Sequence, residues 1–348
     1  MSAEAMESGF GARMRALPDA RLHATLLDVQ PLYYAEGANL ELDRPAHVRS
    51  GSSLHRHRDG LVLVQDDANF IALLQPATGR ITTWTLPHGP QARRQFDDTL
   101  GNKEYKLDLE AAVILPDDRL LAMGSGSSAQ RETMVLLELN AADAQPRLVH
   151  AHRFYAALRT RPVFAGSELN VEGAALLGQV IRLFNRGNGA PKIGQVAVNA
   201  SIDFDVQQFM RYLEDPARAP VPDPLDLRQY ELGSLAGRAL TFTDASAYGS
   251  IVLFTAAAEL SPDATRDGPV SGSIFGVLLG GSGCWAPICD RTGAVAPIKV
   301  EGIALDPSQP ERAFVIVDPD DPVRPSDFCT VQLDGPWPHL RTRYSSFP

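Results

Sequence analysis

The sequence is poor in cysteine, in long apolar runs and in basic charge. Three cysteines, Cys284, Cys289 and Cys329, occur among 348 residues. This odd and sparse set forms neither a disulfide framework nor the paired CxxC ligands of a structural zinc site. No run approaches the roughly 18 apolar residues of a membrane helix, and residues 1–22 lack the apolar stretch of a signal peptide. These absences predict a cytoplasmic protein that contacts no membrane.

Acidic side chains outnumber basic ones, 42 to 32, which gives a net charge of −10. This balance provides no electrostatic attraction to nucleic acid or to an anionic membrane surface. It is typical of soluble proteins, and it also suits a protein that binds a cation. We expect a monomer that contacts neither nucleic acid nor a membrane, with a small molecule as its ligand.

Several catalytic signatures are also missing. The chain contains no GxSxG nucleophile elbow, P-loop, GxGxxG fingerprint or HExxH zinc motif. Two His-x-His pairs occur, His55/His57 and His150/His152. Each pair is predicted to lie on a strand face of its own, so the two pairs are not expected to form one metal site. Any chemistry must therefore come from other side chains that the fold brings together.

One short phrase is repeated, with a glutamate at the head of an apolar, strand-like run each time. The copies are LEAAVIL (109–115), VEGAALL (171–177) and VEGIAL (300–305), and their glutamates are Glu110, Glu172 and Glu301. These glutamates are 62 and 129 residues apart, close to one and two copies of a single period. A fixed long period is the signature of a repeat architecture.

Two further segments, SGSSL (50–54) and FTDASAY (242–248), fall at the same spacing without the glutamate, and Asp244 takes the polar position in the second. Short strand-like runs separated by turn residues fill each unit. Four short strands per unit is the composition of a propeller blade. The sequence thus predicts an all-β, five-bladed β-propeller with four-stranded antiparallel blades, and six blades are the alternative.

The domain boundaries follow from closure of the ring. Only 47 residues follow Glu301, too few for a complete blade, so the N-terminal strand region His23–Glu41 is expected to complete it. Closure removes the exposed sheet edges that a linear stack would leave. We predict a flexible segment over residues 1–22 and a single β-propeller domain over residues 23–348, closed by its N- and C-terminal strands.

Polar residues are expected to gather at one mouth of the channel. The innermost strand of a blade and its neighbour run in opposite directions, so the start of the first and the end of the second face one rim. The second strands end in Asp66–Asn69, Gly124–Ser128, Asn185–Gly189, Glu259 and Asp318–Asp321. Such residues are also ordinary turn formers. The glutamates are the stronger signal, because a buried carboxylate is costly unless it is paired or bound to a cation.

Rings of carboxylate oxygens suit Ca²⁺, which takes roughly six to eight oxygen ligands, whereas transition metals prefer histidine or cysteine. The predicted calcium ligands are Glu110, Glu172, Glu301 and Asp244. Arginines at the same rim would either offset the carboxylate charge or bind a phosphate through bidentate hydrogen bonds.

The phrases LEAAV, VEGAALL…NRGNG, FTDASA and VEGIAL…DPDDP resemble an uncharacterised group of bacterial β-propellers. That group looks related to the phytase-like (esterase-like) propeller superfamily, and the resemblance spans residues 45–335. It implies channel-mouth carboxylates that hold Ca²⁺ and the hydrolysis of phosphate esters or anhydrides by water. The full set of basic substrate-binding residues of those enzymes is not matched in this chain.

Two functional hypotheses remain open. In the first, the protein is a Ca²⁺-dependent hydrolase that acts on a phosphorylated small molecule. Asp67 or Asp318 then positions the attacking water, and the substrate-binding residues are Arg131, Arg186, Asn185 and Asn188. In the second, a non-catalytic propeller presents this rim to a ligand or partner protein, and any bound ion only stabilises the ring.

Overall fold

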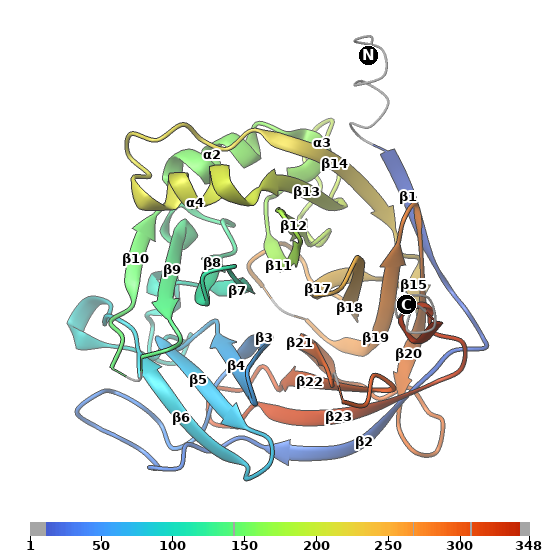
Figure 1. Cartoon of the computed structure of the whole chain (residues 1–348), viewed down its shortest axis with the longest axis horizontal. Helices are drawn as coiled ribbons and strands as arrows, with labels where there is room; N and C mark the ends of the chain where they lie inside the picture. The colour runs from blue at the N-terminus through green and yellow to red at the C-terminus, as the bar shows by residue number, and fades with distance from the viewer. Residues whose placement is uncertain (1–11, 142, 267, 307, 342–348) are drawn as a thin grey trace, which may run out of the picture.

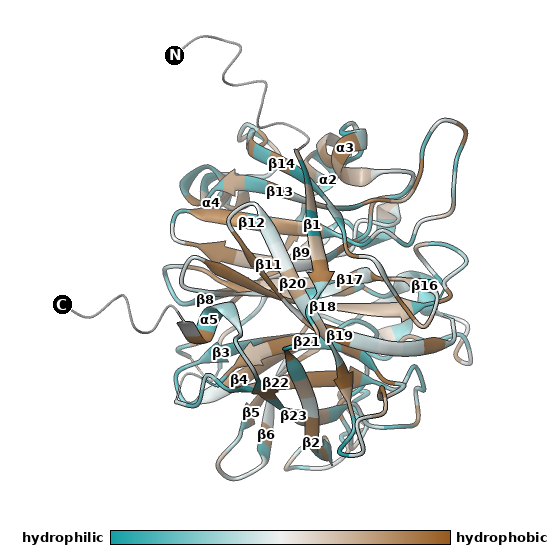
Figure 2. Ribbon diagram, turned by 90° about the vertical axis from the view of Figure 1, so that its right-hand side faces the viewer, coloured by the Kyte–Doolittle hydropathy of each residue, from teal (hydrophilic) through white to brown (hydrophobic). Residues whose placement is uncertain are grey.

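Short strands separated by turns account for most of this protein, and few helices interrupt them (Figure 1). The computed structural model describes residues 12–141, 143–266, 268–306 and 308–341. Several strands are apolar along nearly their whole length, as in GLVLVQ at 60–65 and RLLAMG at 119–124, where only Gln65 and Arg119 are polar. A continuous apolar run fits a strand that is buried on both faces. In Figure 2 the strands are mainly brown and the connecting loops mainly teal.

The first two groups of strands form separate four-stranded antiparallel sheets. The strands of the first are β3 (Gly51–His57), β4 (Gly60–Gln65), β5 (Phe70–Gln75) and β6 (Arg80–Thr85). Those of the second are β7 (Leu109–Ile114), β8 (Arg119–Gly124), β9 (Thr133–Glu138) and β10 (Arg147–His150). Three short 3₁₀ helices lie in the connections: η1 (Pro90–Ala92), η2 (Lys103–Tyr105) and η3 (Ala129–Arg131).

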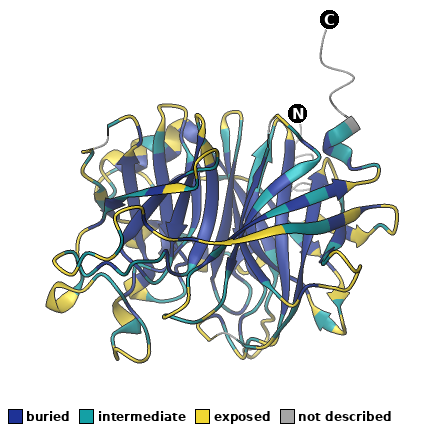
Figure 3. Cartoon of the chain, turned by 90° about the horizontal axis from the view of Figure 1, so that it is seen from below, coloured by how far each residue is buried: buried dark blue, intermediate teal, exposed yellow. Residues whose placement is uncertain are grey.

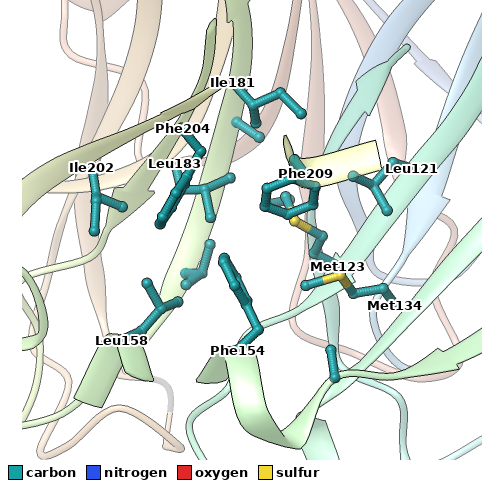
Figure 4. Packing of buried hydrophobic residues seen from close by; sticks show 14 of the residues in the cluster. Leu121, Met123, Met134, Phe154, Leu158, Ile181, Leu183, Ile202, Phe204 and Phe209 are labelled. Atoms are coloured by element: carbon teal, nitrogen blue, oxygen red, sulfur yellow. The ribbon is translucent and has the colours of Figure 1, made fainter. Parts of the chain in front are cut away.

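A third group carries the helices of the fold. Its antiparallel strands are β11 (Val171–Leu177), β12 (Val180–Asn185), β13 (Asn199–Asp205) and β14 (Pro224–Glu231). The helices beside it are α2 (His152–Arg159), α3 (Pro162–Ala165) and α4 (Val206–Glu214). Figure 4 shows Phe154 of α2 facing Phe209 of α4, with a ring-centroid distance of 5.1 Å. Both rings belong to a hydrophobic cluster that includes residues of the second and third groups, so the helices pack against both groups.

The remaining strands form two more antiparallel groups. The fourth comprises β17 (Thr241–Tyr248), β18 (Ile251–Glu259), β19 (Val270–Leu279) and β20 (Ser282–Cys289). The fifth comprises β21 (Lys299–Leu305), β22 (Arg312–Asp318), β23 (Asp327–Asp334) and the N-terminal strand β2 (His23–Pro31). A small hairpin of β15 (Ser234–Leu235) and β16 (Arg238–Ala239) precedes the fourth group, and helix α5 (Pro338–Arg341) follows the fifth.

The N-terminal strand β2 therefore completes the last group by pairing with β23, from His23 opposite Asp334 to Pro31 opposite Asp327. This pairing lies within the region that the sequence predicted for ring closure. Because β2 hydrogen-bonds along β23, the outer edge of β23 does not present unpaired backbone groups to water.

Strand β1 (Ala12–Pro18) departs from the predicted flexible segment over residues 1–22. It pairs in parallel with β14 on one side and with β20 on the other, and so joins the third and fourth groups. With β2, it makes these groups part of one 13-stranded sheet among the described residues. The physical reason is that β14 and β20 each leave an open edge that a single strand can satisfy. Residues 1–11 lie outside the described residues.

The first strands of the five groups contact one another in a closed circuit: β3, β7, β11, β17, β21 and again β3. Hydrophobic clusters fill the spaces between neighbouring groups, as where Leu63 of β4 meets Ile316 of β22. Figure 3 shows the strands buried and the loops at their ends exposed. The first strands thus surround a common centre, with loops at both ends. No helix in the described part of the chain is long and apolar enough to cross a membrane.

Candidate functional site

Each first strand contains a β-bulge near its start. The register shifts lie between Gly51 and Ser53, Leu109 and Ala111, Val171 and Gly173, Phe242 and Asp244, and Val300 and Gly302. The residues left without a strand partner are therefore Ser52, Glu110, Glu172, Thr243 and Glu301. A bulge redirects a side chain. The repeated glutamates thus occupy equivalent bulge positions, and Ser52 and Thr243 take the same place in the two strands without a glutamate.

Asp244 is one residue out of register with the glutamates, because Thr243 is their counterpart. Successive side chains of a strand point to opposite faces, so a shift of one residue reverses the direction. Asp244 is fully buried and accepts hydrogen bonds from the Ile303 amide at 2.8 Å and from Ser53 Oγ at 3.3 Å. Its carboxyl joins neighbouring sheets, and it does not line the cavity that the glutamates share.

The three glutamates line one small cavity, which we call the central cavity. Its acidic lining residues are Asp66, Asp108, Glu110, Glu172, Glu301, Asp318 and Asp320. Its basic lining residues are Lys106, Arg131, Arg186, Arg266 and Lys299. The volume is about 40 Å³, enough for roughly three water-sized occupants. With all groups ionised, these described side chains leave an excess of two negative charges.

Most of the residues predicted from the sequence line this cavity, including Arg131, Arg186, Asn188 and Asp318. Asn185 and Asp67 do not. Asn185 is fully buried, and its side chain accepts a hydrogen bond from the Asn170 amide and donates one to the Val198 carbonyl. Asp67 lies in an adjoining cavity of about 140 Å³, where it is ion-paired with Arg49 at 2.6 Å.

The acidic wall of the central cavity contains Asp66, which the sequence analysis placed at the rim but not among the metal ligands, and Asp108, which it did not predict. Carboxylate oxygens of Asp66, Asp108 and Glu110 all lie within 4.8 Å of one another. The ammonium group of Lys106 lies between them, 2.6 Å from Asp66 Oδ2 and 2.6 Å from Asp108 Oδ1. Asp66 Oδ1 is buried without a hydrogen-bonding partner. This wall therefore combines a lysine-held carboxylate pair with one unsatisfied oxygen.

A signal for part of this wall is present in the sequence KLDLE at 106–110. Lys106, Asp108 and Glu110 alternate with two leucines, a pattern that predicts one polar and one apolar face, although β7 begins only at Leu109 and Asp108 has a positive φ of 56°. In the structure, Leu107 and Leu109 pack in the hydrophobic cluster between the first two sheets, while the polar residues line the cavity. The proximity of Asp66 comes from a different sheet, and no local pattern predicts it.

Another part of the lining, which we call the ion-pair wall, is a network of buried ion pairs around Glu172 and Glu301. Arg186 lies 3.3 Å from Glu172 Oε1 and also contacts Glu259. Lys299 lies 3.0 Å from Glu301 Oε1. Glu301 is only 5% exposed, and its second oxygen, Oε2, is buried without a hydrogen-bonding partner. Each wall thus contributes one carboxylate oxygen that the described side chains leave unsatisfied.

Burial controls the protonation of these carboxyl groups. It raises the pKa of Glu110 and of Asp318 well above the usual range, and nearby carboxylates add to the effect. The pKa of Glu301 is raised to about 8 by burial, against the opposing effect of Lys299. Burial and Asp66 raise the pKa of Asp67 to about 6, against Arg49. Ionising all of these groups at once is costly, which favours either bound protons or a bound cation.

We expect the stability of the cation-free protein to fall as the pH rises from about 4.5 to about 8, and Glu301→Gln to reduce that fall. The folded-state pKa of Glu301, about 8, is above its ordinary value of 4.5. Stability from the buried neutral acid is therefore fully present below the ordinary pKa and is lost through the folded-state pKa. Melting temperatures in a chelator at several pH values measure this. A difference between variant and wild type that stays constant from pH 5 to pH 9 contradicts it.

Residues 47–333 match the model of a family of unknown function, DUF6929. The chain belongs to this family. No curated protein matches the DUF6929 chain in sequence. Solved structures that are similar to it include a protein of unknown function from Bacteroides thetaiotaomicron, with 11% identity and a TM-score of 0.40. That match covers 85% of the DUF6929 chain and 59% of the other, so the chain spans less than two thirds of that protein.

Two further solved structures are similar over nearly their whole length. The PQQ-bound aldose sugar dehydrogenase from Streptomyces coelicolor has 10% identity and a TM-score of 0.39, over 91% of the DUF6929 chain and 100% of its own. A luciferin-regenerating enzyme has 10% identity and a TM-score of 0.44, over 89% and 97% of the two chains.

Proposed function

We propose that the DUF6929 chain is a five-bladed β-propeller that binds a divalent cation in its central cavity. The blade number rests on the five groups of four antiparallel strands and on the closed circuit of their first strands. The cation rests on one observation above all: the oxygens of Asp66, Asp108 and Glu110 converge within 4.8 Å. When all of the lining groups are ionised, the cavity has an excess of two negative charges, which one divalent ion would neutralise.

The donor set fits Ca²⁺ better than a transition metal, because all of these ligands are carboxylate oxygens. Asp66 Oδ1 is buried without a partner and supplies an oxygen that is free to coordinate. Asp66, Asp108 and Glu110 would hold the ion, and Glu172 and Glu301 line the same cavity at the ion-pair wall. A bound Ca²⁺ supplies Lewis-acid stabilisation of negative charge on a phosphoryl oxygen.

We further propose that the site hydrolyses a phosphorylated small molecule, as the phytase-like resemblance of the repeated phrases implies. Arg131 and Arg186 line the central cavity and would orient the anionic group of the substrate. Asp67 and Asp318 both line the adjoining cavity, which shares Asp66 and Lys106 with the central one. With a pKa of about 6, Asp67 is mostly ionised at neutral pH and can accept a proton from a water molecule held there. Asp318, whose pKa burial raises, can hold the same water as a hydrogen-bond donor.

Calcium titration tests the cation site. We expect isothermal titration calorimetry to show saturable Ca²⁺ binding to the wild type and a higher melting temperature with Ca²⁺ than with chelator. Asp66→Asn should weaken binding at least about tenfold, because it removes a ligand charge from the acidic wall. Asp226→Asn is the matched control, since Asp226 pairs with Arg228 on the outer strand β14. Equal Ca²⁺ affinity in wild type and Asp66→Asn would contradict the proposed calcium site.

The non-catalytic alternative has its own supporting observation. The Lys106 ammonium group already lies 2.6 Å from two of the three carboxylates. It therefore neutralises part of their negative charge without a metal ion. A panel of phosphate mono- and diesters with and without Ca²⁺ separates the two functions. Ca²⁺ binding that raises the melting temperature without turnover of any ester favours a ligand-binding propeller. Ca²⁺-dependent turnover that Asp67→Asn reduces favours the hydrolase.

A further inference from the structure

A second, larger cavity lies beside the central one, and we call it the side cavity. Its volume is about 370 Å³, against about 40 Å³ for the central cavity. Ala264 and Thr265, from the loop between β18 and β19, line both. This loop is therefore the partition between them, and a ligand at the partition can reach both spaces.

The wall of the side cavity is assembled from three loops that one carboxylate holds together. Glu168 Oε2 accepts hydrogen bonds from the Ala190 amide at 3.1 Å and from the Ala264 amide at 3.2 Å. These residues follow different strands, β12 and β18, and Glu168 itself precedes β11. The side cavity is thus defined by tied loops rather than by a chance surface gap.

The charged lining residues of the side cavity are Arg159, Glu168, Lys192 and Asp263, two of each sign, and each has an ion-pair partner. Lys192 lies 3.4 Å from Glu168 Oε1, and Arg266 lies 2.6 Å from Asp263. Arg159 contacts Glu132 and the Gly126 carbonyl. These pairs balance in charge, so the side cavity offers no net attraction to an ionic group, in contrast with the central cavity.

Uncharged polar groups point to the kind of ligand. Ser167 lines the side cavity, is 5% exposed, and its Oγ is buried without a hydrogen-bonding partner. A buried hydroxyl without a partner costs free energy, and a ligand hydroxyl would satisfy it. Ser127 and Gln195 add a hydroxyl and an amide, and Leu169 adds an apolar surface. Ser127 Oγ also accepts a hydrogen bond from Arg131, a central-cavity residue, at 2.9 Å.

We propose that the side cavity binds the neutral, hydroxyl-bearing part of an organic ligand whose anionic group enters the central cavity. The anionic part of this ligand rests on the proposed function of the central cavity, whereas its neutral, hydroxyl-bearing part does not. It defines the ligand as an anion attached to a polyhydroxylated group rather than to an aliphatic chain. Thr265 and Ala264 lie where the two parts of such a ligand join.

The test compares three probes, glucose 6-phosphate, n-hexyl phosphate and inorganic phosphate, by calorimetry in the presence of CaCl₂. Wild type is expected to bind glucose 6-phosphate at least about tenfold more tightly than the other two. Ala190→Tyr, which places a large side chain in the side cavity, should abolish this preference and leave inorganic phosphate affinity unchanged. Ser167→Ala should weaken glucose 6-phosphate about three- to tenfold, the effect of one lost hydrogen bond. Ala239→Tyr, in a separate groove beside β1, is the matched control.

The outcomes separate the two proposals. Inorganic phosphate binding without a preference for glucose 6-phosphate overturns the side-cavity ligand and leaves the central site standing. Equal weakening of both probes by Ala190→Tyr overturns it as well. If no phosphate probe binds, D-glucose alone is tested by ligand-observed NMR. Glucose binding that Ala190→Tyr removes then supports the side cavity although the central proposal fails, and no glucose binding overturns both.

Discussion

We expect Lys106→Met to destabilise the cation-free protein by about 3–5 kcal/mol, the usual cost of removing one partner from a buried ion pair. Lys106 is 6% exposed, and its ammonium group touches Asp66 and Asp108 at 2.6 Å each. Methionine fills a similar volume but leaves two close carboxylates without their shared cation. Ca²⁺ should then restore much of the lost stability, because the same oxygens are the proposed calcium ligands. Urea unfolding in chelator and in CaCl₂ measures both effects.

Lys103→Met provides the control for Lys106→Met. Lys103 is nearby in the chain, but it pairs with the exposed Asp98 at 3.3 Å and is itself 31% exposed. An exposed pair of this kind contributes little, about 0–1 kcal/mol. A large loss for Lys106→Met that Ca²⁺ does not relieve contradicts calcium binding at this wall. A loss no greater than that of Lys103→Met contradicts the buried ion pair.

The repeated phrases were sufficient to locate the first strands, because each combines an apolar run with a fixed spacing. VEGAALL coincides with β11, and LEAAVIL and VEGIAL differ from β7 and β21 by one residue at an end. Their glutamates meet because equivalent bulges direct equivalent side chains to one centre. Strand β2 was predicted from a counting argument, since the last group lacked an outer strand.

Other features depend on contacts that no single segment contains. Asp66 reaches Asp108 only because the first two sheets pack against each other, and β1 forms only because β14 and β20 leave open edges. Helix α2 was missed because a strand was predicted through His152. Its buried residues Phe154, Tyr155 and Leu158 span too few turns to give a clear helical period. Asp244 was assigned to the rim because bulges are not visible in the sequence, and one residue of register reverses its side chain.

Arg186→Met is expected to be as destabilising as Lys106→Met, about 3–5 kcal/mol, but with at most partial relief by Ca²⁺, because Glu172 lines the central cavity and Glu259 does not. Arg186 is 3% exposed and joins Glu172 of β11 to Glu259 of β18, and it also donates to Thr241 Oγ1 at 3.2 Å. Removing the guanidinium leaves two buried carboxylates without this partner, one in the third group of strands and one in the fourth. Glu259 does not line the central cavity, so an ion bound there cannot replace the lost contact. Urea unfolding with and without CaCl₂ distinguishes this variant from Lys106→Met.

A second substitution tests the cause of the Arg186 effect. If unpaired buried charge destabilises Arg186→Met, the double variant Arg186→Met/Glu259→Gln should be more stable than Arg186→Met alone. Glu259→Gln removes one of the two carboxylates that lost Arg186 as a partner. Arg228→Met is the control, because Arg228 is 25% exposed and pairs with Asp226 at the edge of the third group. Full recovery by CaCl₂ would show that a metal ion can replace Arg186 as it replaces Lys106. No gain from Glu259→Gln would show that unpaired buried charge is not the cause of the instability. The expected results would show that a metal ion can replace Lys106 at the acidic wall, whereas Arg186 is needed to join the third and fourth groups of strands.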